Sequence, residues 1–148
     1  MWVCYVLMSV DSGRTYVGAT NNLLRRLNNH NRISGGSHGA RATRGEMWMP
    51  ILFVSGFKDK IGCLSFESGV RRVVRRRGKK RYKLGWGISP IERRVISVFN
   101  LLYLGSPLKK WTRDGLQINW LEVEYRMDNL ELPDGVSEKC GIGEVALS

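Results

Sequence analysis

Four polar side chains with the chemistry to handle a phosphate group lie near the start of the chain: Tyr5, Tyr16, Arg26 and His30. A phenol can hydrogen-bond a phosphate or position a water. It can also act as a base if cationic neighbours or a metal lower its pKa from about 10. An arginine can bind two oxygens of one phosphate, and a histidine can hold a phosphate oxygen or shuttle a proton. The set indicates phosphodiester chemistry.

A single glutamate, Glu67, follows on an expected helix. One carboxylate suits Mg²⁺, which keeps most of its waters when it binds a protein. Each residue also has a plainer explanation. Strand tyrosines such as Tyr5 and Tyr16 usually pack half-buried, and Arg26 could lie on a solvated helix face. Glu67 could be a surface charge, and His30 could favour a helix dipole. The order and spacing of all five together favour a one-metal hydrolase.

These side chains must be positioned by a strand–turn–strand–helix unit. Residues 2–9 read as a buried strand and residues 14–19 as its return strand, joined by turn residues between them. Thr20 and Asn21 are candidate N-caps for a helix at 22–30. Because Arg26 and His30 are four residues apart, they should share one face of that helix. The helix should bury the leucines at 23, 24 and 27.

The rest of the chain predicts an α+β domain, a small and mainly antiparallel sheet with helices on its faces. Further elements are expected as a strand at 48–57, a helix at 59–77, a helix from Ser89 to about Leu104, and a strand at 117–123. Ser89, Pro90 and Glu92 form a helix-start signature. We therefore divide the chain into a core at 1–84, a helix–strand extension packed on it at 85–125, and a mobile acidic tail at 126–148.

The charge of the chain predicts a polyanionic partner. Of 148 residues, 24 are Lys or Arg and 13 are Asp or Glu, for a net charge of +11 and a pI near 10.1. Residues 1–83 hold 17 of the basic residues and 4 of the acidic ones. Tight, sequence-independent binding to DNA phosphates is therefore expected on this part. A solvated face or a nuclear localisation signal would also explain the run at 71–83. DNA contact is favoured because the run begins one helical turn after Glu67. The expected DNA contacts are Arg25, Arg41, Arg44, Arg71, Arg72, Arg75, Arg76, Lys79 and Lys80.

The cysteines indicate a reducing environment. Cys4, Cys63 and Cys140 are odd in number and no pair has CxxC spacing, so neither a disulfide framework nor a zinc site is predicted. Residues 2–8 are apolar but too short to span a bilayer. We expect an intracellular protein with no membrane partner.

The motifs resemble those of the GIY-YIG nuclease superfamily. Its two name motifs occur in variant form as Cys4-Tyr5-Val6 and Tyr16-Val17-Gly18, with cysteine in place of the first glycine. The segments through Arg25-Arg26-Leu27, His30-Asn31 and Leu64-Ser65-Phe66-Glu67 look like the Slx-type branch, the catalytic subunit of a structure-selective endonuclease. So does the helix near 92–104 with Pro107, Trp111 and Trp120-Leu121. The resemblance covers about residues 2–122.

The resemblance implies a function and a site. It implies a divalent-metal-dependent endonuclease that cuts branched DNA, such as flaps and Holliday junctions, in DNA repair and recombination. The active-site positions would be Tyr5, Tyr16, Arg26, His30 and Glu67, with Glu67 holding one Mg²⁺ or Mn²⁺. Gly18 would leave the strand end open to substrate. Either tyrosine could serve as base. The protein would act in the nucleus or wherever the DNA is replicated.

Some features leave alternatives open. Slx-type enzymes carry a C-terminal zinc-binding RING-like domain that docks on a scaffold. This sequence has one cysteine after residue 63 and no histidine after His38, so that domain is not expected and a scaffold partner stays open. A homing-type nuclease would need a recognition module, which the net acidic residues 84–148 do not suggest. A non-catalytic DNA- or RNA-binding protein on a nuclease-like fold is the alternative from a different class.

Overall fold

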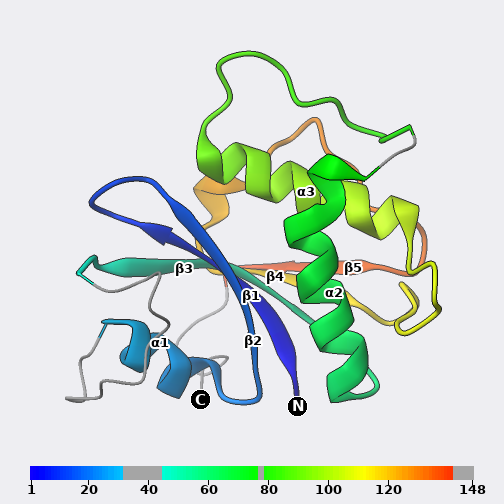
Figure 1. The fold of residues 1–148 in the computed structure, drawn as a ribbon, viewed down its shortest axis with the longest axis horizontal. Coiled ribbons are helices and arrows are strands. Elements are labelled where there is room, and N and C mark those ends of the chain that lie inside the picture. Colours follow the sequence, from blue (N-terminus) through cyan, green and yellow to red (C-terminus); the bar gives the residue numbers. More distant parts are fainter. Residues whose placement is uncertain (32–44, 77–78, 142–148) are drawn as a thin grey trace.

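The computed structural model describes residues 1–31, 45–76 and 79–141. It contains a five-stranded sheet in the order β2-β1-β3-β4-β5 with helices on both faces (Figure 1). This confirms the predicted α+β class. The strands are β1 (Val3–Ser9), β2 (Thr15–Thr20), β3 (Trp48–Ser55), β4 (Gln117–Trp120) and β5 (Ser137–Cys140). The helices are α1 (Leu23–Asn31), α2 (Lys60–Arg72) and α3 (Pro90–Leu104), with 3-10 turns η2 (Val73–Arg75) and η3 (Val123–Tyr125).

The hairpin of β1 and β2 sets the register of the site. The strands are antiparallel and pair Tyr5 with Gly18 and Leu7 with Tyr16. Since successive side chains of a strand point to opposite faces, Tyr5 and Tyr16 share one face of the sheet. Because β2 lies at the end of the strand order, residues on it border the sheet edge.

Local sequence signals explain where the helices begin. The side chain of Asn22 accepts a hydrogen bond from the backbone N–H of Arg25 at 3.0 Å, so Asn22 caps α1 rather than Thr20 or Asn21. The Asp59 carboxylate accepts from the N–H of Gly62 at 2.7 Å and caps α2. At α3, Ser89 and Glu92 form a reciprocal capping box, and Pro90 occupies the first turn.

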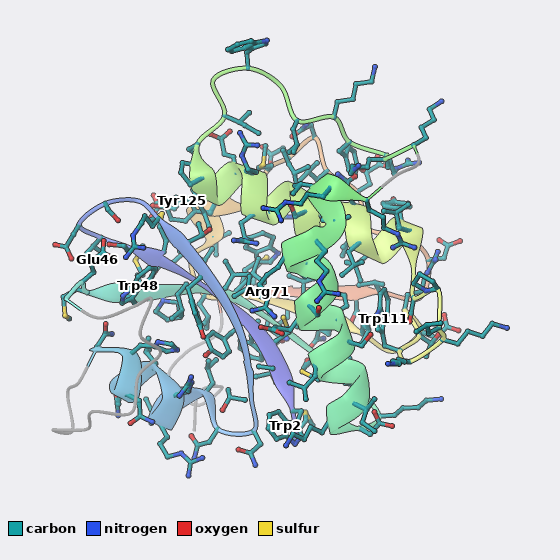
Figure 2. The ribbon with its side chains drawn as sticks, viewed as in Figure 1. Trp2, Glu46, Trp48, Arg71, Trp111 and Tyr125 are labelled. Carbon is teal, nitrogen blue, oxygen red and sulfur yellow. The ribbon has the colours of Figure 1, made fainter. Side chains whose placement is uncertain are left out.

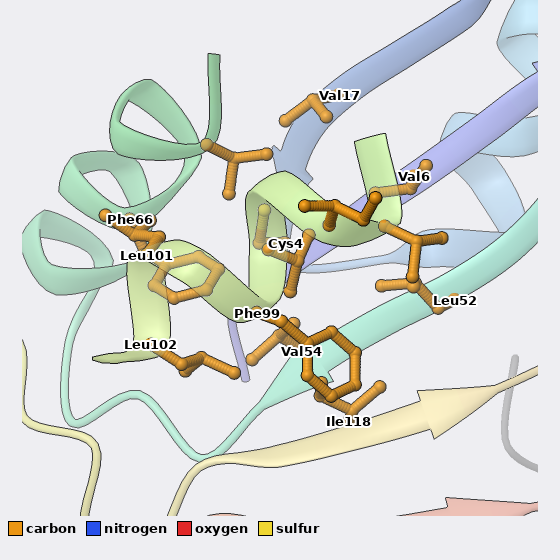
Figure 3. Packing of buried hydrophobic residues seen from close by; sticks show 14 of the residues in the cluster. Cys4, Val6, Val17, Leu52, Val54, Phe66, Phe99, Leu101, Leu102 and Ile118 are labelled. Atoms are coloured by element: carbon orange, nitrogen blue, oxygen red, sulfur yellow. The ribbon is translucent and has the colours of Figure 1, made fainter. Parts of the chain in front are cut away.

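Two hydrophobic clusters cover the two faces of the sheet. On one face α2 and α3 pack against the sheet in the larger cluster, which includes Cys4, Phe66 and Phe99 (Figure 3). On the other face Leu23 of α1 packs in a smaller cluster with Tyr5. Figure 1 accordingly shows the β1–β2 hairpin between α1 and α2. Residues on α1 and on α2 therefore lie on opposite faces of the sheet.

The C-terminal part differs from the sequence prediction. Instead of a mobile tail from 126, residues up to 141 return to the sheet, where β5 pairs in parallel with β4. Leu130 is only 1% exposed within the larger cluster. Arg126 pairs with Glu138 at 2.9 Å and lies over the ring of Phe99. The acidic, Gly-containing composition suggested mobility, but these few apolar and paired contacts fix the segment.

Other boundaries also shift. The helix expected to reach residue 77 ends at Arg72 and continues as the 3-10 turn η2, so Val74 is exposed rather than inward-facing. Leu24, expected to be buried, is exposed as well. The strand expected at 117–123 ends at Trp120. Among the described residues, no helix combines the length and the apolar character needed to cross a membrane.

Candidate active site

Tyr5 reaches across β2 at Gly18. A Cβ atom added to Gly18 would lie only 2.4 Å from the Tyr5 hydroxyl oxygen, well inside van der Waals contact. The phenol ring therefore lies directly against the glycine, and its hydroxyl extends toward the sheet edge. Gly18 therefore makes room for the Tyr5 side chain. That it also leaves the strand end open to substrate stays a prediction.

Side chains of α1 meet this hydroxyl. The Tyr5 oxygen is 2.9 Å from Nε2 of His30, and Nε–H of Arg26 donates to it at 3.3 Å. The ring of Tyr16 packs edge-on against His30, with centroids 4.8 Å apart, and lies 6.3 Å from the ring of Tyr5. Arg26 also hydrogen-bonds Tyr16. Four of the five predicted site residues are thus in one connected cluster on the α1 face.

Burial sets the protonation states of this cluster. It raises the pKa of Tyr5 well above the ordinary value for tyrosine, although the Arg26 guanidinium acts in the opposite direction. Burial, followed by the charge of Arg26, lowers the pKa of His30 to about 4. At neutral pH, Tyr5 keeps its proton and His30 is uncharged. The environment therefore argues against Tyr5 as a base and makes it a hydrogen-bond donor.

Arg26 remains the charged member of the cluster. Burial alone would lower its pKa, but its hydrogen bonds with Tyr5 and Tyr16 raise it above the usual value. These bonds fix the direction of the guanidinium, which is half-buried at the α1 face. A charged fork held in one orientation is suited to bind phosphate oxygens.

Glu67 stands apart from the cluster. It lies on α2, on the other face of the sheet, and its carboxylate accepts a hydrogen bond from Arg71 at 3.2 Å. Its side chain is 12% exposed, and burial raises its pKa although the charge of Arg71 lowers it. A group that contacts both Glu67 and the tyrosines would therefore have to reach around the sheet from one face to the other.

The predicted DNA-contacting residues occupy several surfaces. Arg71 lies between α2 and the β1–β2 hairpin (Figure 2). Arg72, Arg75 and Arg76 line a different groove of about 850 Å³, between α2 and residues 105–111. Arg25 is exposed on α1. Lys79 is exposed, whereas the ammonium of Lys80 donates to the carbonyl of Arg76 at 2.8 Å. Arg41 and Arg44 lie outside the described residues.

Two basic residues that the sequence analysis did not single out also border the β2 edge. Arg93 and Arg94, in the first turns of α3, line a pocket with Arg71. Nε–H of Arg94 donates to the hydroxyl of Thr15, the first residue of β2, at 3.2 Å. The only sequence signal was a pair of arginines in a segment predicted as part of the extension, because their distance from β2 along the chain hides the contact.

A mainly antiparallel sheet whose edge hairpin and first helix bring together two tyrosines, an arginine and a histidine is the arrangement expected of the GIY-YIG nuclease class. Comparison with known families agrees, since the GIY-YIG catalytic domain matches residues 1–83. That match covers more than half of the chain. The chain therefore belongs to the GIY-YIG family of endonucleases.

Several relatives refine this assignment. The chain is 42% identical over 121 residues to the uncharacterized protein L300 of Acanthamoeba polyphaga mimivirus, with 73% of each protein covered. It is 42% identical over 71 residues to the structure-specific endonuclease subunit SLX1 homolog of Giardia intestinalis, covering 45% of this chain and 19% of that protein. It is 29% identical over 143 residues to the SLX1 homolog of Drosophila ananassae, covering 95% and 48% respectively. The two SLX1 homologs confirm the Slx-type resemblance, although the chain spans less than half of either of them.

Proposed function

We propose that this protein is a divalent-metal-dependent endonuclease that cuts branched DNA, such as flaps and Holliday junctions. The observation that carries the proposal is the cluster of Tyr5, Tyr16, Arg26 and His30 on one face of the hairpin, at the sheet edge. Its hydrogen bonds pre-orient a charged guanidinium beside two phenols. The SLX1 names of the relatives support the structure-selective substrate, and the +11 net charge supports a DNA partner.

Each residue of the cluster takes a role that its surroundings favour. Arg26 would bind a non-bridging oxygen of the scissile phosphate and offset the charge that grows in the transition state. Tyr5, which keeps its proton, would hold Arg26 and His30 in place. Tyr16, on the edge strand itself, would orient the water that attacks phosphorus in line with the leaving oxygen.

Glu67 is the residue that would hold a metal ion. Its mostly buried carboxylate, whose pKa burial raises, gains from a nearby cation. Among the residues that the structure describes, no three His, Cys, Asp or Glu side chains come together as a metal-binding group. A single carboxylate fits Mg²⁺ or Mn²⁺, which keep several waters. When bound, such an ion would neutralise charge on the leaving oxygen.

A cleavage assay on a labelled flap tests the proposal. The parent is compared with Glu67→Gln and Arg26→Ala, with and without Mg²⁺. We expect metal-dependent product from the parent. Arg26→Ala should lower the cleavage rate by roughly 10²–10³, the size of loss seen when a hydrogen-bond donor to a transition state is removed. DNA affinity and the unfolding temperature should change little in either variant. A parent that binds flaps but yields no product with Mg²⁺ or Mn²⁺ would support the non-catalytic binding protein instead.

A collapse of the thermal transition in Arg26→Ala would assign that residue to structure rather than to catalysis. Arg26→Lys separates the two possibilities further. Lysine keeps the positive charge but cannot supply the planar fork, so folding and DNA affinity should be kept while cleavage remains low. Equal cleavage by the lysine variant and the parent would contradict the role that we assign to the guanidinium.

A further inference from the structure

A second cationic pocket lies at the β2 edge, on the α2 and α3 side of the sheet. It has a volume of about 240 Å³. Arg71 comes from α2, Arg93 and Arg94 come from α3, and Thr15 of β2 closes one side. Arg71 is one helical turn after Glu67 and pairs with it. The pocket therefore adjoins the residue proposed to hold the metal ion, from the opposite side to the tyrosine cluster.

The charges around this pocket do not balance. Three arginines line it, and the described residues that line it include no carboxylate. Glu67, through its pair with Arg71, is the carboxylate that offsets one of these charges. Glu92, next to Arg93, is already engaged in the capping box with Ser89. Arg94 is partly buried, whereas Arg71 and Arg93 are exposed. Like charges gathered around one pocket repel, so the arrangement favours a bound anion.

The Arg94 side chain is held in place rather than free in solvent. It is partly buried and bonded to the Thr15 hydroxyl at 3.2 Å. Burial, and next the charge of Arg71, lower the pKa of Arg94. An arginine fork fixed in this way matches the two non-bridging oxygens of a phosphodiester.

We propose that Arg71, Arg93 and Arg94 form a binding pocket for a phosphodiester group of the DNA substrate other than the scissile one. The inference rests on the proposed nuclease function, because that function supplies the polyanion. The pocket would anchor the strand along the β2 edge, so that the scissile phosphate reaches Arg26 on one side and Glu67 on the other. Free inorganic phosphate has the same chemistry and is the alternative occupant.

The salt dependence of DNA binding tests this pocket. Binding of a labelled flap is measured by fluorescence anisotropy in the presence of a chelator, so that no cleavage occurs, over a series of salt concentrations. Loss of one phosphate contact reduces the slope of log K against log salt by about 0.9 for duplex DNA and 0.7 for a single strand. We expect that reduction for Arg93→Gln and for Arg94→Gln, with an affinity loss of roughly 5- to 30-fold.

Matched variants separate a local contact from a general effect of charge. Lys139→Gln removes one exposed charge on β5, at the other end of the strand order, and should leave the slope nearly unchanged. Arg94→Lys keeps the charge and should keep the slope while affinity falls. If Arg94→Gln lowers the unfolding temperature through loss of the Thr15 bond, the exposed Arg93 carries the test. Slopes for both glutamine variants equal to that of Lys139→Gln would overturn the proposal.

A phosphate titration distinguishes the two sources of the anion. Inorganic phosphate that raises the unfolding temperature of the parent but not of Arg93→Gln, together with unchanged DNA slopes, would assign the pocket to a free anion and overturn a DNA contact. Because binding is measured without metal, a parent that does not cleave DNA still yields the slopes. Failure of the nuclease proposal can therefore be told apart from failure of this pocket.

Discussion

Gly18 determines where the Tyr5 hydroxyl can lie. It thereby sets the geometry of the cluster that Tyr5 forms with Tyr16, Arg26 and His30. A methyl group at position 18 would clash with the phenol oxygen, which forms contacts to both His30 and Arg26. Gly18→Ala should therefore displace the ring and cost about 1–3 kcal/mol of stability. Flap cleavage should fall further than this loss alone explains, because Arg26 loses a partner. Thermal unfolding and single-turnover cleavage measure the two effects.

The control for this substitution is Gly85→Ala. A Cβ at Gly85 meets nothing within 4 Å, so the change adds the same methyl group in open space. It should leave cleavage unchanged. Parent-like cleavage by Gly18→Ala would mean that the hydroxyl position does not matter to the reaction.

His30 predicts a pH dependence of stability. Its folded-state pKa is about 4, below the value of about 6.5 expected for the unfolded chain. The unfolded state therefore binds more protons between these values, and stability is lost as the pH falls through that window. We expect His30 to contribute about 1–3 kcal/mol above pH 6.5 that is absent near pH 4. Urea unfolding of the parent and of His30→Gln from pH 4.5 to 7.5 measures this.

The difference between parent and His30→Gln should narrow toward acidic pH. Glutamine does not titrate, so the variant reports the pH dependence of all other groups. A constant difference across the range would mean that the folded protein accommodates a protonated His30.

At the scale of elements, α2 and the 3-10 turn η2 that follows it present their arginines to two separate surfaces. Arg71 borders the β2 edge, whereas Arg75 lines the groove toward residues 105–111. We expect Arg75→Gln to weaken DNA binding and flatten its salt slope with no change in unfolding temperature, since Arg75 is exposed. The guanidinium of Arg76 donates to the carbonyl of Gly105 at 3.4 Å, so Arg76→Gln should also lower stability slightly. An unchanged salt slope of DNA binding in Arg75→Gln would mean that this groove does not contact DNA phosphates.

How much of each element could be predicted depended on whether its signal was local. The start of α3 was predictable because Ser89, Pro90 and Glu92 carry the capping box within four residues. The hairpin was predictable from the turn residues between its two strands. The shared face of Arg26 and His30 was predictable from their spacing of four residues on a helix. The end of α2 could not be predicted, because the apolar residues after Arg72 keep helical spacing while the backbone there forms the 3-10 turn η2. The contact of Arg94 with Thr15 joins residues 79 positions apart and leaves no local trace.

The separation of Glu67 from the cluster follows the same logic. The sequence placed it on a helix after β3, but not on which face of the sheet that helix packs. The structure sets α2 on the side opposite α1, because its Phe66 and Val70 bury into the cluster that contains Cys4 rather than Tyr5. Under the proposed function, one phosphate would bind at the β2 edge, where Tyr16 lies on the strand itself and Arg71, the partner of Glu67, borders the strand from α2.

At the scale of the whole molecule, the sheet is completed by residues from the end of the described chain. Leu130 is 1% exposed in the larger cluster, and β5 extends the sheet beyond β4. If this segment contributes to the fold, Leu130→Ala should cost about 2–4 kcal/mol by removing buried contacts and leaving a cavity. That loss should lower the unfolding temperature by roughly 5–15 °C for a domain of this size.

The control is Leu108→Ala, at a leucine that is 75% exposed, which should change the free energy of unfolding by no more than about 0.5 kcal/mol. A Leu130 variant as stable as the Leu108 variant would mean that this segment contributes nothing to the stability of the core. Even a destabilised Leu130 variant should cleave DNA like the parent at temperatures below its unfolding transition, since Leu130 lies outside the candidate active site.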